Sequence, residues 1–115
     1  MRGLKVTVYG RTRLGFFQER AALKKYLTGS SKGCLEMVQL RHRDLKDIYV
    51  GLVDADAEVK QHDYNPLATM MSGMPIYGQM VICRKDRLAF KGIEDKDMDY
   101  LSRFTKKMLE VGKNE

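Results

Sequence analysis

The stretch KVTVYGRTRLGFFQERAALKKYL, which runs from Lys5 to Leu27, decides the fold that the sequence predicts. It continues an alternation of apolar and polar side chains that starts at Leu4, a pattern typical of a β-strand. The segment from Gly10 to Gly15 then reads as a basic turn, and from Phe16 apolar residues recur at helical spacing. Backbone N–H groups are free at the start of such a helix, where α/β proteins commonly bind anions or carry out chemistry. We therefore expect the functional site at this turn.

The rest of the chain predicts three more strands and two more helices. The loop TGSSKG ends the first helix, and Asn65 followed by Pro66 is typical of a capped helix start. The expected strands are residues 35–40, 76–83 and 88–91, and the last two form a hairpin. The expected helices are residues 65–72 and a final helix with the apolar stripe Met98, Leu101, Phe104, Met108 and Val111.

Residues 44–61 fit two interpretations. Leu45, Ile48 and Leu52 follow helical steps after Asp44, whereas the run IYVGLV alone is typical of a strand. We favour the helix, although Gly51 is a poor residue inside one. A strand, a helix and a second strand in succession then predict a right-handed crossover, with the first two strands parallel.

Composition indicates one domain with a positive surface. The 115 residues carry a net charge of +6, which favours anionic partners without choosing among them. The two cysteines, Cys34 and Cys83, form no CxxC motif or zinc-ligand cluster, so a reduced setting is expected. The N-terminus lacks the apolar core of a signal peptide, and no apolar run approaches the roughly 18 residues of a membrane span. We expect a soluble, cytoplasmic protein without membrane contact.

The sequence resembles the glutaredoxins within the thioredoxin-fold superfamily. VTVYGRTRLGFFQERAALKKYL is similar to a glutaredoxin opening in which a strand, Tyr, a basic residue, CPYC and a helix follow one another. HDYNPLA is similar to the Asp-x-Asn-Pro of many thioredoxins, and Met74-Pro75 occupies the position of the family's cis-proline. KGIED lies where glutaredoxins have a Gly-Gly-x-Asp-Asp-like turn. The resemblance implies a single thioredoxin-like domain, residues 1–115, with a mixed four-stranded sheet, helices on both faces, and residues 41–61 as a helical insertion.

The residues of the expected site depart from the family in one decisive respect. Leu14, Gly15, Phe16 and Phe17 occupy the CPYC positions, so the attacking thiolate of disulfide exchange is missing. Cys34 and Cys83 would lie on separated strands, about 10 Å apart, too far for a disulfide. We expect both to be buried core residues, which leaves no catalytic residue at the site.

A basic and apolar surface remains at this position. With Phe16 in the core, Phe17 is expected to face outward beside two arginines. Guanidinium groups and free helix N–H groups suit a carboxylate, a phosphate or an acidic side chain. The candidate binding residues are Arg11, Arg13, Leu14, Gly15, Phe17, Met74 and Pro75.

These observations favour a redox-inactive, glutaredoxin-like protein that binds a protein segment or a small anion, without a cofactor or metal. One alternative is a glutathione-linked enzyme or thiol oxidoreductase, with glutathione held by Arg11. A second is a nucleic-acid-binding protein that uses the net charge of +6.

Overall fold

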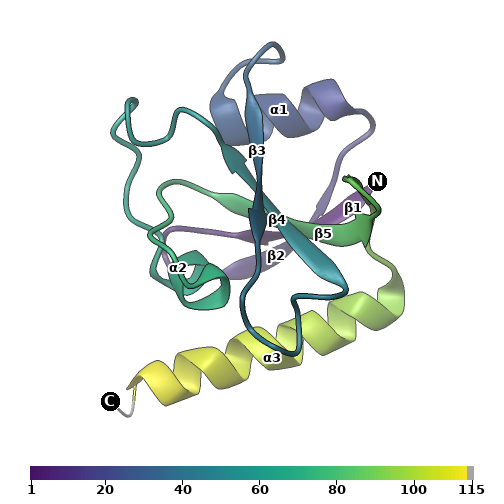
Figure 1. Ribbon diagram of the computed structural model, residues 1–115, viewed down its shortest axis with the longest axis vertical. Helices are drawn as coiled ribbons and strands as arrows, with labels where there is room; N and C mark the ends of the chain where they lie inside the picture. The colour runs from purple at the N-terminus through teal and green to yellow at the C-terminus, as the bar shows by residue number, and fades with distance from the viewer. Residues whose placement is uncertain (114–115) are drawn as a thin grey trace.

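The computed structural model describes residues 1–113, with side chains through Glu110, and arranges them as one sheet with helices on both faces (Figure 1). The strands are β1 (Arg2–Val6), β2 (Thr12–Phe16), β3 (Leu35–Gln39), β4 (Tyr49–Asp54), β5 (Met80–Asp86) and β6 (Ala89–Lys91). The helices are α1 (Arg20–Thr28), α2 (Pro66–Ser72) and α3 (Asp95–Lys113). None of these helices is both long and apolar enough to cross a membrane.

Every strand pair in the sheet is antiparallel, and the strands lie in the order β2-β1-β5-β4-β3. β5 is long enough to hold two partners along one edge. Its residues 80–82 pair with β1, and its residues 84–86 pair with β6. β6 therefore continues the line of β1, and the Ile93 N–H donates to the Arg2 carbonyl at 3.0 Å where the two meet. β2 and β3 are the outermost strands of the order.

Separate apolar clusters cover the two faces of the sheet. α1 packs on one face, where Leu23 and Leu27 join Leu52 and Val81 of the central strands. α2 and α3 lie on the opposite face (Figure 1), and Leu67, Met71 and Leu101 pack there against a larger cluster. Successive side chains of a strand point to opposite faces, and both faces are covered here, so residues 49–53 of β4 and 80–83 of β5 are apolar on both faces. β4 is buried at all of its residues.

The structure contradicts the predicted thioredoxin-like fold. The sheet has six strands and is antiparallel, not four-stranded and mixed. The first strand does not lead into a helix, because Gly10 adopts a left-handed φ of +75° and the chain folds back into β2. The Thr7 N–H donates to the Arg11 carbonyl at 2.9 Å across this turn. A three-residue hairpin loop that ends in a left-handed glycine explains the reversal, and the predicted parallel crossover is wrong.

Two further predictions are wrong for local reasons. Residues 49–54 form β4, the strand that the sequence offered as its second interpretation, and not a helix. Gly51 fits there because Met80 crosses it, with its Sδ only 2.6 Å from where a Cβ would lie. The Met74-Pro75 peptide bond is trans, since the described residues contain no cis bond. The expected cis-proline is therefore absent.

Predictions based on caps and stripes are confirmed. α2 begins after Asn65, whose side chain accepts from the Ala68 N–H, and ends at Gly73 with a left-handed φ. α3 carries the predicted stripe, with Leu101 buried and Met98, Phe104 and Met108 partly buried against the core. The side chain of Val111, the last residue of the stripe, lies outside the described side chains.

Candidate functional site

Most of the stretch that the sequence assigned to the site is an outer strand. β2 pairs with β1 along one edge, and within the described part of the chain no strand pairs along its other edge. The strand is held at both ends. The Thr7 N–H donates to the Arg11 carbonyl at 2.9 Å, and the Phe17 N–H donates to the Met1 carbonyl at 2.8 Å.

These hydrogen bonds decide which backbone groups of β2 point outward. In an antiparallel ladder, residues that exchange hydrogen bonds with the partner strand alternate with residues that do not. Because residues 11 and 17 bond toward β1, the odd-numbered residues between them do so as well. The N–H and C=O groups of Thr12, Leu14 and Phe16 therefore point away from the sheet. An edge of this kind is a template for another strand.

The side chains of β2 divide into an apolar face and a basic face. Leu14 and Phe16 lie on the α3 side, where they are 49% and 70% exposed. Arg13 lies on the α1 side opposite Lys5, and Arg11 follows the same alternation. Both arginines are exposed, and the described ion pairs include neither of them.

Phe16 and Phe17 exchange the roles that helical spacing predicted. Phe17 is 5% exposed and packs against Tyr26, with ring centroids 5.7 Å apart. The ammonium group of Lys5 lies 5.6 Å from the Phe17 centroid and 4.3 Å from that of Tyr26. Burial raises the pKa of Tyr26 despite the positive charge of Arg13 nearby. The exposed ring of this pair is therefore that of Phe16, while Phe17 packs in the core on the α1 side of the sheet.

Gly15 has a packing role in this arrangement. A Cβ at this position would lie 2.8 Å from Cε of Lys5 and 3.0 Å from Cε2 of Phe17. Both distances are shorter than ordinary contacts, so a side chain would displace the Lys5 stem. The absence of a side chain at Gly15 lets Lys5 reach across the strand toward the aromatic rings.

Met74 and Pro75 are not brought to this surface. They follow α2, and Pro75 lines a small pocket of about 260 Å³ with Asp54 and Glu58, to which β2 contributes no residue. That pocket lies beside β4, two strands away from β1 in the sheet order counted through β5. The structure therefore brings together Arg11, Arg13, Leu14 and Gly15 and places Met74 and Pro75 elsewhere.

The two cysteines are free and differ in exposure. Cys83 is buried on the α1 face, and burial raises its pKa to about 12. Cys34 is exposed before β3, so the expectation that it is a core residue is wrong. Among the described residues, no group of three or more His, Cys, Asp or Glu side chains is placed to hold a metal ion.

Sequence reasoning missed a groove on the α3 side of the sheet. It has a volume of about 590 Å³ and lies between α3, α2 and the connection from β3 to β4. Phe104 and Met108 belong to the predicted apolar stripe of the last helix, and both are partly buried and line this groove. Tyr100 lies four residues before Phe104, so it is next to the apolar stripe on the surface of α3 and widens it. The position of Tyr100 beside that stripe was the available signal.

Comparison of the chain with protein-family models, curated proteins and solved structures finds no match. The function is therefore argued from the surfaces described above.

Proposed function

We propose that this chain is a non-enzymatic binding protein that takes up an extended segment of a partner protein along the free edge of β2. The single observation behind the proposal is the outward-pointing backbone of Thr12, Leu14 and Phe16 beside two exposed apolar side chains. Added strands gain affinity from main-chain hydrogen bonds and specificity from alternate side chains. The proposed site keeps the position expected from the sequence. The backbone groups proposed to bind the partner are now those of a strand edge and not those of a helix start.

The two faces of β2 specify the chemistry of the segment. Residues opposite Leu14 and Phe16 would be apolar, since both side chains on that face are exposed. Residues of the other parity would face Arg11 and Arg13, where Asp or Glu side chains complement the charge. We therefore infer an extended segment that alternates acidic and apolar residues.

Charge also argues against a second copy of this chain as the partner strand. An antiparallel second copy would bring its own Arg11 and Arg13 to the same face of the extended sheet. Like charges on neighbouring strands are destabilising, and each chain already carries a net charge of +6. The glutathione-linked alternative relied on Arg11 beside an expected helix start, and α1 instead begins at Arg20.

The first experiment uses a fluorescein-labelled peptide, Glu-Val-Glu-Phe-Glu-Val-Glu, and fluorescence anisotropy. Two further versions carry backbone N-methyl groups, either on the three apolar residues or on the acidic ones. Antiparallel strand addition pairs the apolar residues directly with the outward groups of β2, so their N-methylation removes the bonding N–H groups. We expect affinity to fall by about tenfold or more in that version alone. Equal binding by both methylated peptides would contradict strand addition.

Variants of the protein locate the contact. Leu14→Pro removes an outward N–H without touching the bonds to β1, whereas Leu14→Ala keeps that N–H. Both should weaken binding, and Leu14→Pro should weaken it more than Leu14→Ala, because it also removes one main-chain hydrogen bond to the peptide. Arg11→Gln and Arg13→Gln, each made singly, should weaken binding of the acidic peptide, and Lys91→Gln, which removes one positive charge outside β2, is the control.

A labelled single-stranded oligonucleotide tests the nucleic-acid alternative. Binding to phosphates falls steeply with salt because counterions are released. Oligonucleotide binding that is tighter than peptide binding, steeply salt-dependent and weakened by Arg11→Gln with Arg13→Gln would overturn the assignment of the β2 edge to a protein segment. We expect weak binding that is unaffected by Leu14→Pro.

A further inference from the structure

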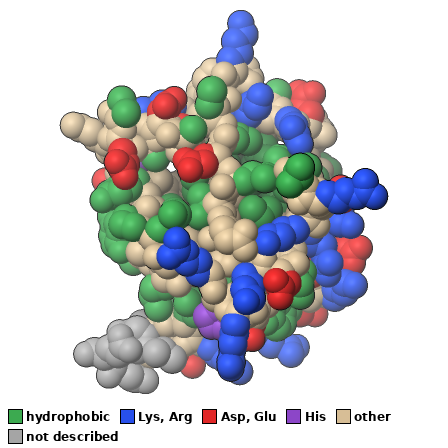
Figure 2. Space-filling view, in the orientation of Figure 1, with side chains coloured by type: hydrophobic (Ala, Val, Ile, Leu, Met, Phe, Trp, Pro, Cys, Tyr) green, Lys and Arg blue, Asp and Glu red, His purple; other side chains and the backbone are tan. Residues whose placement is uncertain are grey.

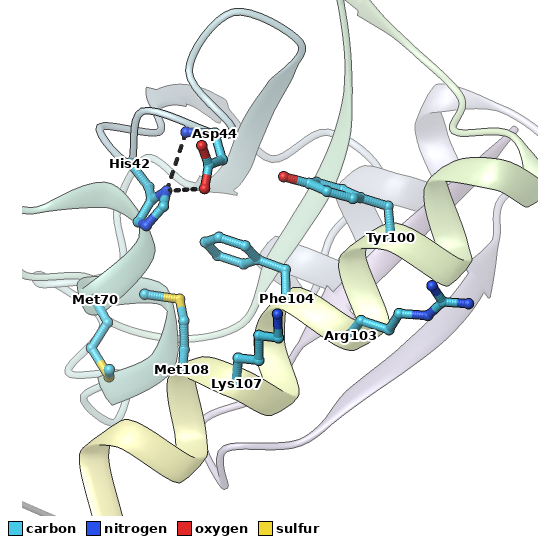
Figure 3. Close-up of a pocket in the computed structure, with 8 residues that line it drawn as sticks. All are labelled: His42, Asp44, Met70, Tyr100, Arg103, Phe104, Lys107 and Met108. Carbon is cyan, nitrogen blue, oxygen red and sulfur yellow. Dashed lines mark hydrogen bonds and ion pairs between the residues drawn. The ribbon is translucent and has the colours of Figure 1, made fainter.

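The groove on the α3 side is formed by three segments that are distant in sequence. His42 and Asp44 come from the connection between β3 and β4, and Met70 comes from α2. The remaining lining residues come from α3 and are Tyr100, Arg103, Phe104, Lys107 and Met108. Figure 3 shows side chains from these segments around a shared space. Neither Leu14 nor Phe16 lines it, so this surface is separate from the edge of β2.

A series of stacked rings gives the groove a fixed wall. Phe104 stacks on Tyr100 with ring centroids 6.3 Å apart, and Tyr100 stacks on Tyr49 at the same spacing. Tyr49 is 2% exposed, and its hydroxyl donates to Asp97 at 2.6 Å. The wall is therefore anchored in the core at Tyr49, and its most exposed ring is that of Tyr100, at 42%.

His42 is held at the end of this series. Its ring meets Phe104 edge to face, with centroids 4.6 Å apart and an interplanar angle of 82°. Nδ1 accepts a hydrogen bond from the Asp44 N–H at 3.2 Å. An imidazole that accepts at Nδ1 carries its proton at Nε2 when neutral, which leaves an Nε2–H donor on the other side of the ring.

Two methionines form the opposite, adaptable part of the lining. Met70 is 42% exposed on α2, and Met108 is partly buried on α3. Both side chains are unbranched and polarizable, so they adjust to the shape of an apolar group and make favourable contacts with aromatic rings. Figure 3 shows them beside each other below His42 and Phe104.

The rim of the groove is positive. The ammonium group of Lys107 rises beside Phe104, while Arg103 extends along α3 away from His42 (Figure 3). The ion pairs of the described residues include neither cation, whereas Asp44 lies 3.7 Å from Nε of Arg43 and 3.8 Å from Nδ1 of His42. Figure 2 shows Lys and Arg side chains gathered over the β3–β4 connection and α3, with fewer acidic ones among them.

We propose that this groove binds a small anionic amphiphile: an aromatic or branched apolar body that carries one anionic group. The body would lie against Phe104, Met70 and Met108, and the anionic group would reach Lys107 and the Nε2–H of His42. A volume of about 590 Å³ falls in the range of small-molecule sites, which are mostly apolar with a few placed polar groups. This inference concerns a second ligand class and does not depend on strand addition at β2.

Two dyes with the same ring system test the proposal on the full chain. Anilinonaphthalene sulfonate carries an anionic group, and N-phenylnaphthylamine has the same body without it. Both become fluorescent in apolar sites. We expect saturable binding of one anionic dye per chain, with the neutral dye weaker by about fivefold. Equal affinity for the two dyes, or no saturable binding, would overturn the proposal.

Neighbouring lysines of α3 provide a matched pair of variants. Lys107 lines the groove and Lys106 does not. Lys107→Gln should therefore lower the affinity for the anionic dye by about fivefold and leave the affinity for the neutral dye unchanged. Lys106→Gln should change neither affinity. Equal effects of the two variants would show attraction by net charge alone and would contradict a specific site.

A second pair tests the apolar lining. Met70→Glu places a charge in the groove and should abolish binding of both dyes. Leu88→Glu makes the same charge change at a side chain that is 94% exposed in the β5–β6 turn and lies outside the groove. Circular dichroism confirms that each variant is folded. If Leu88→Glu were as harmful as Met70→Glu, or if the acidic β2 peptide displaced the dye, the groove would not be the separate site proposed.

Discussion

The Tyr49 hydroxyl donates a 2.6 Å hydrogen bond to Oδ1 of Asp97, which joins the start of β4 to the first turn of α3. Arg84 of β5 donates to both oxygens of the same carboxylate, at 2.7 and 2.8 Å. The backbone N–H of Glu94 donates to Oδ2 at 2.8 Å, so Asp97 also caps the helix start. One buried carboxylate therefore connects two central strands to the helix that lines the groove.

Replacing Asp97 by Asn should destabilise the protein strongly. The change removes the charge that pairs with Arg84 and presents an amide group to donors. We expect a loss of about 3 kcal/mol in the free energy of unfolding, measured by urea denaturation at pH 7. Asp95→Asn is the matched control two residues away, because its pair with Arg2 is exposed and should change stability by less than about 1 kcal/mol.

The same carboxylate predicts a pH dependence. Burial raises the pKa of Asp97, but hydrogen bonds from Arg84, Tyr49 and the Glu94 N–H lower it by a larger amount. The resulting pKa is about 2. A group with a depressed folded-state pKa stabilises fully above its unfolded value, about 3.9, and loses this contribution as the pH falls toward the folded value. The stability difference between the wild type and Asp97→Asn should be constant from neutral to mildly acidic pH and shrink below about pH 4. A difference that persists at low pH would contradict this assignment.

Asn65 offers a sharper test of a buried polar group. Its side-chain amide donates to the carbonyls of Val6 and Gly78, each at 2.9 Å, while Oδ1 accepts from the Ala68 N–H at 3.0 Å. Asn65→Ala leaves these groups unpaired and should cost about 3 kcal/mol. Asn65→Asp keeps the helix cap but turns a carboxylate oxygen toward two carbonyls.

The Asp variant should therefore be at least as unstable as the Ala variant at neutral pH. It should recover part of its stability in acid, where a protonated carboxyl again donates. Thermal unfolding of the wild type and both variants at two pH values measures this. If Asn65→Asp matched the wild type at pH 7, the side chain would act at Asn65 as a cap alone.

The two cysteines should react with thiol reagents at very different rates. Cys34 is exposed, whereas Cys83 is 0% exposed and its pKa is raised by burial to about 12. Only thiolates react with an aromatic disulfide reagent. We expect one thiol per chain to be labelled in the native protein and both in denaturant, with Cys34→Ser removing the rapid phase. Rapid labelling in Cys34→Ser would show that the β5 strand opens readily.

The contrast between elements explains how much of the fold the sequence could predict. The prediction of α2 was correct because Asn65 and Pro66 define its start and Gly73 defines its end, and all three act through local backbone geometry. The reversal after Val6 depends on Gly10, and a glycine between two apolar runs fits a hairpin as well as a loop before a helix. The choice between them is made by the pairing of β2 with β1, which no local pattern contains.

The candidate surfaces were predicted unequally for a related reason. Arg11, Arg13 and Leu14 were already candidates in the sequence, because a polar and apolar mixture after a strand is visible there. Phe16 and Phe17 were interchanged because a helix and a strand place successive side chains differently. The groove joins His42 to Phe104 across 62 positions of the sequence, as the numbering shows, so only the folded chain brings its lining together.

A second buried carboxylate, Asp54 at the end of β4, gives the last prediction. The ammonium group of Lys60 lies 2.8 Å from its Oδ2, and Nε2 of His62 lies 3.0 Å from the same oxygen. Gln61, between these two donors, has a left-handed φ of 57°. Burial raises the pKa of Asp54, but hydrogen bonds from Lys60, the Asp56 N–H and His62 lower it overall.

Lys60→Met should therefore destabilise the protein by about 1–2 kcal/mol at pH 7, because Asp54 is only 2% exposed on its side chain and loses a charged donor. The depressed pKa means that this contribution is present above the unfolded value and disappears in acid. The urea midpoints of the wild type and Lys60→Met should thus converge below about pH 4. Lys32→Met, at an exposed loop lysine, should show no such difference at any pH, and parallel midpoints for Lys60→Met across the whole range would place the effect in lost packing of the lysine stem rather than in its charge.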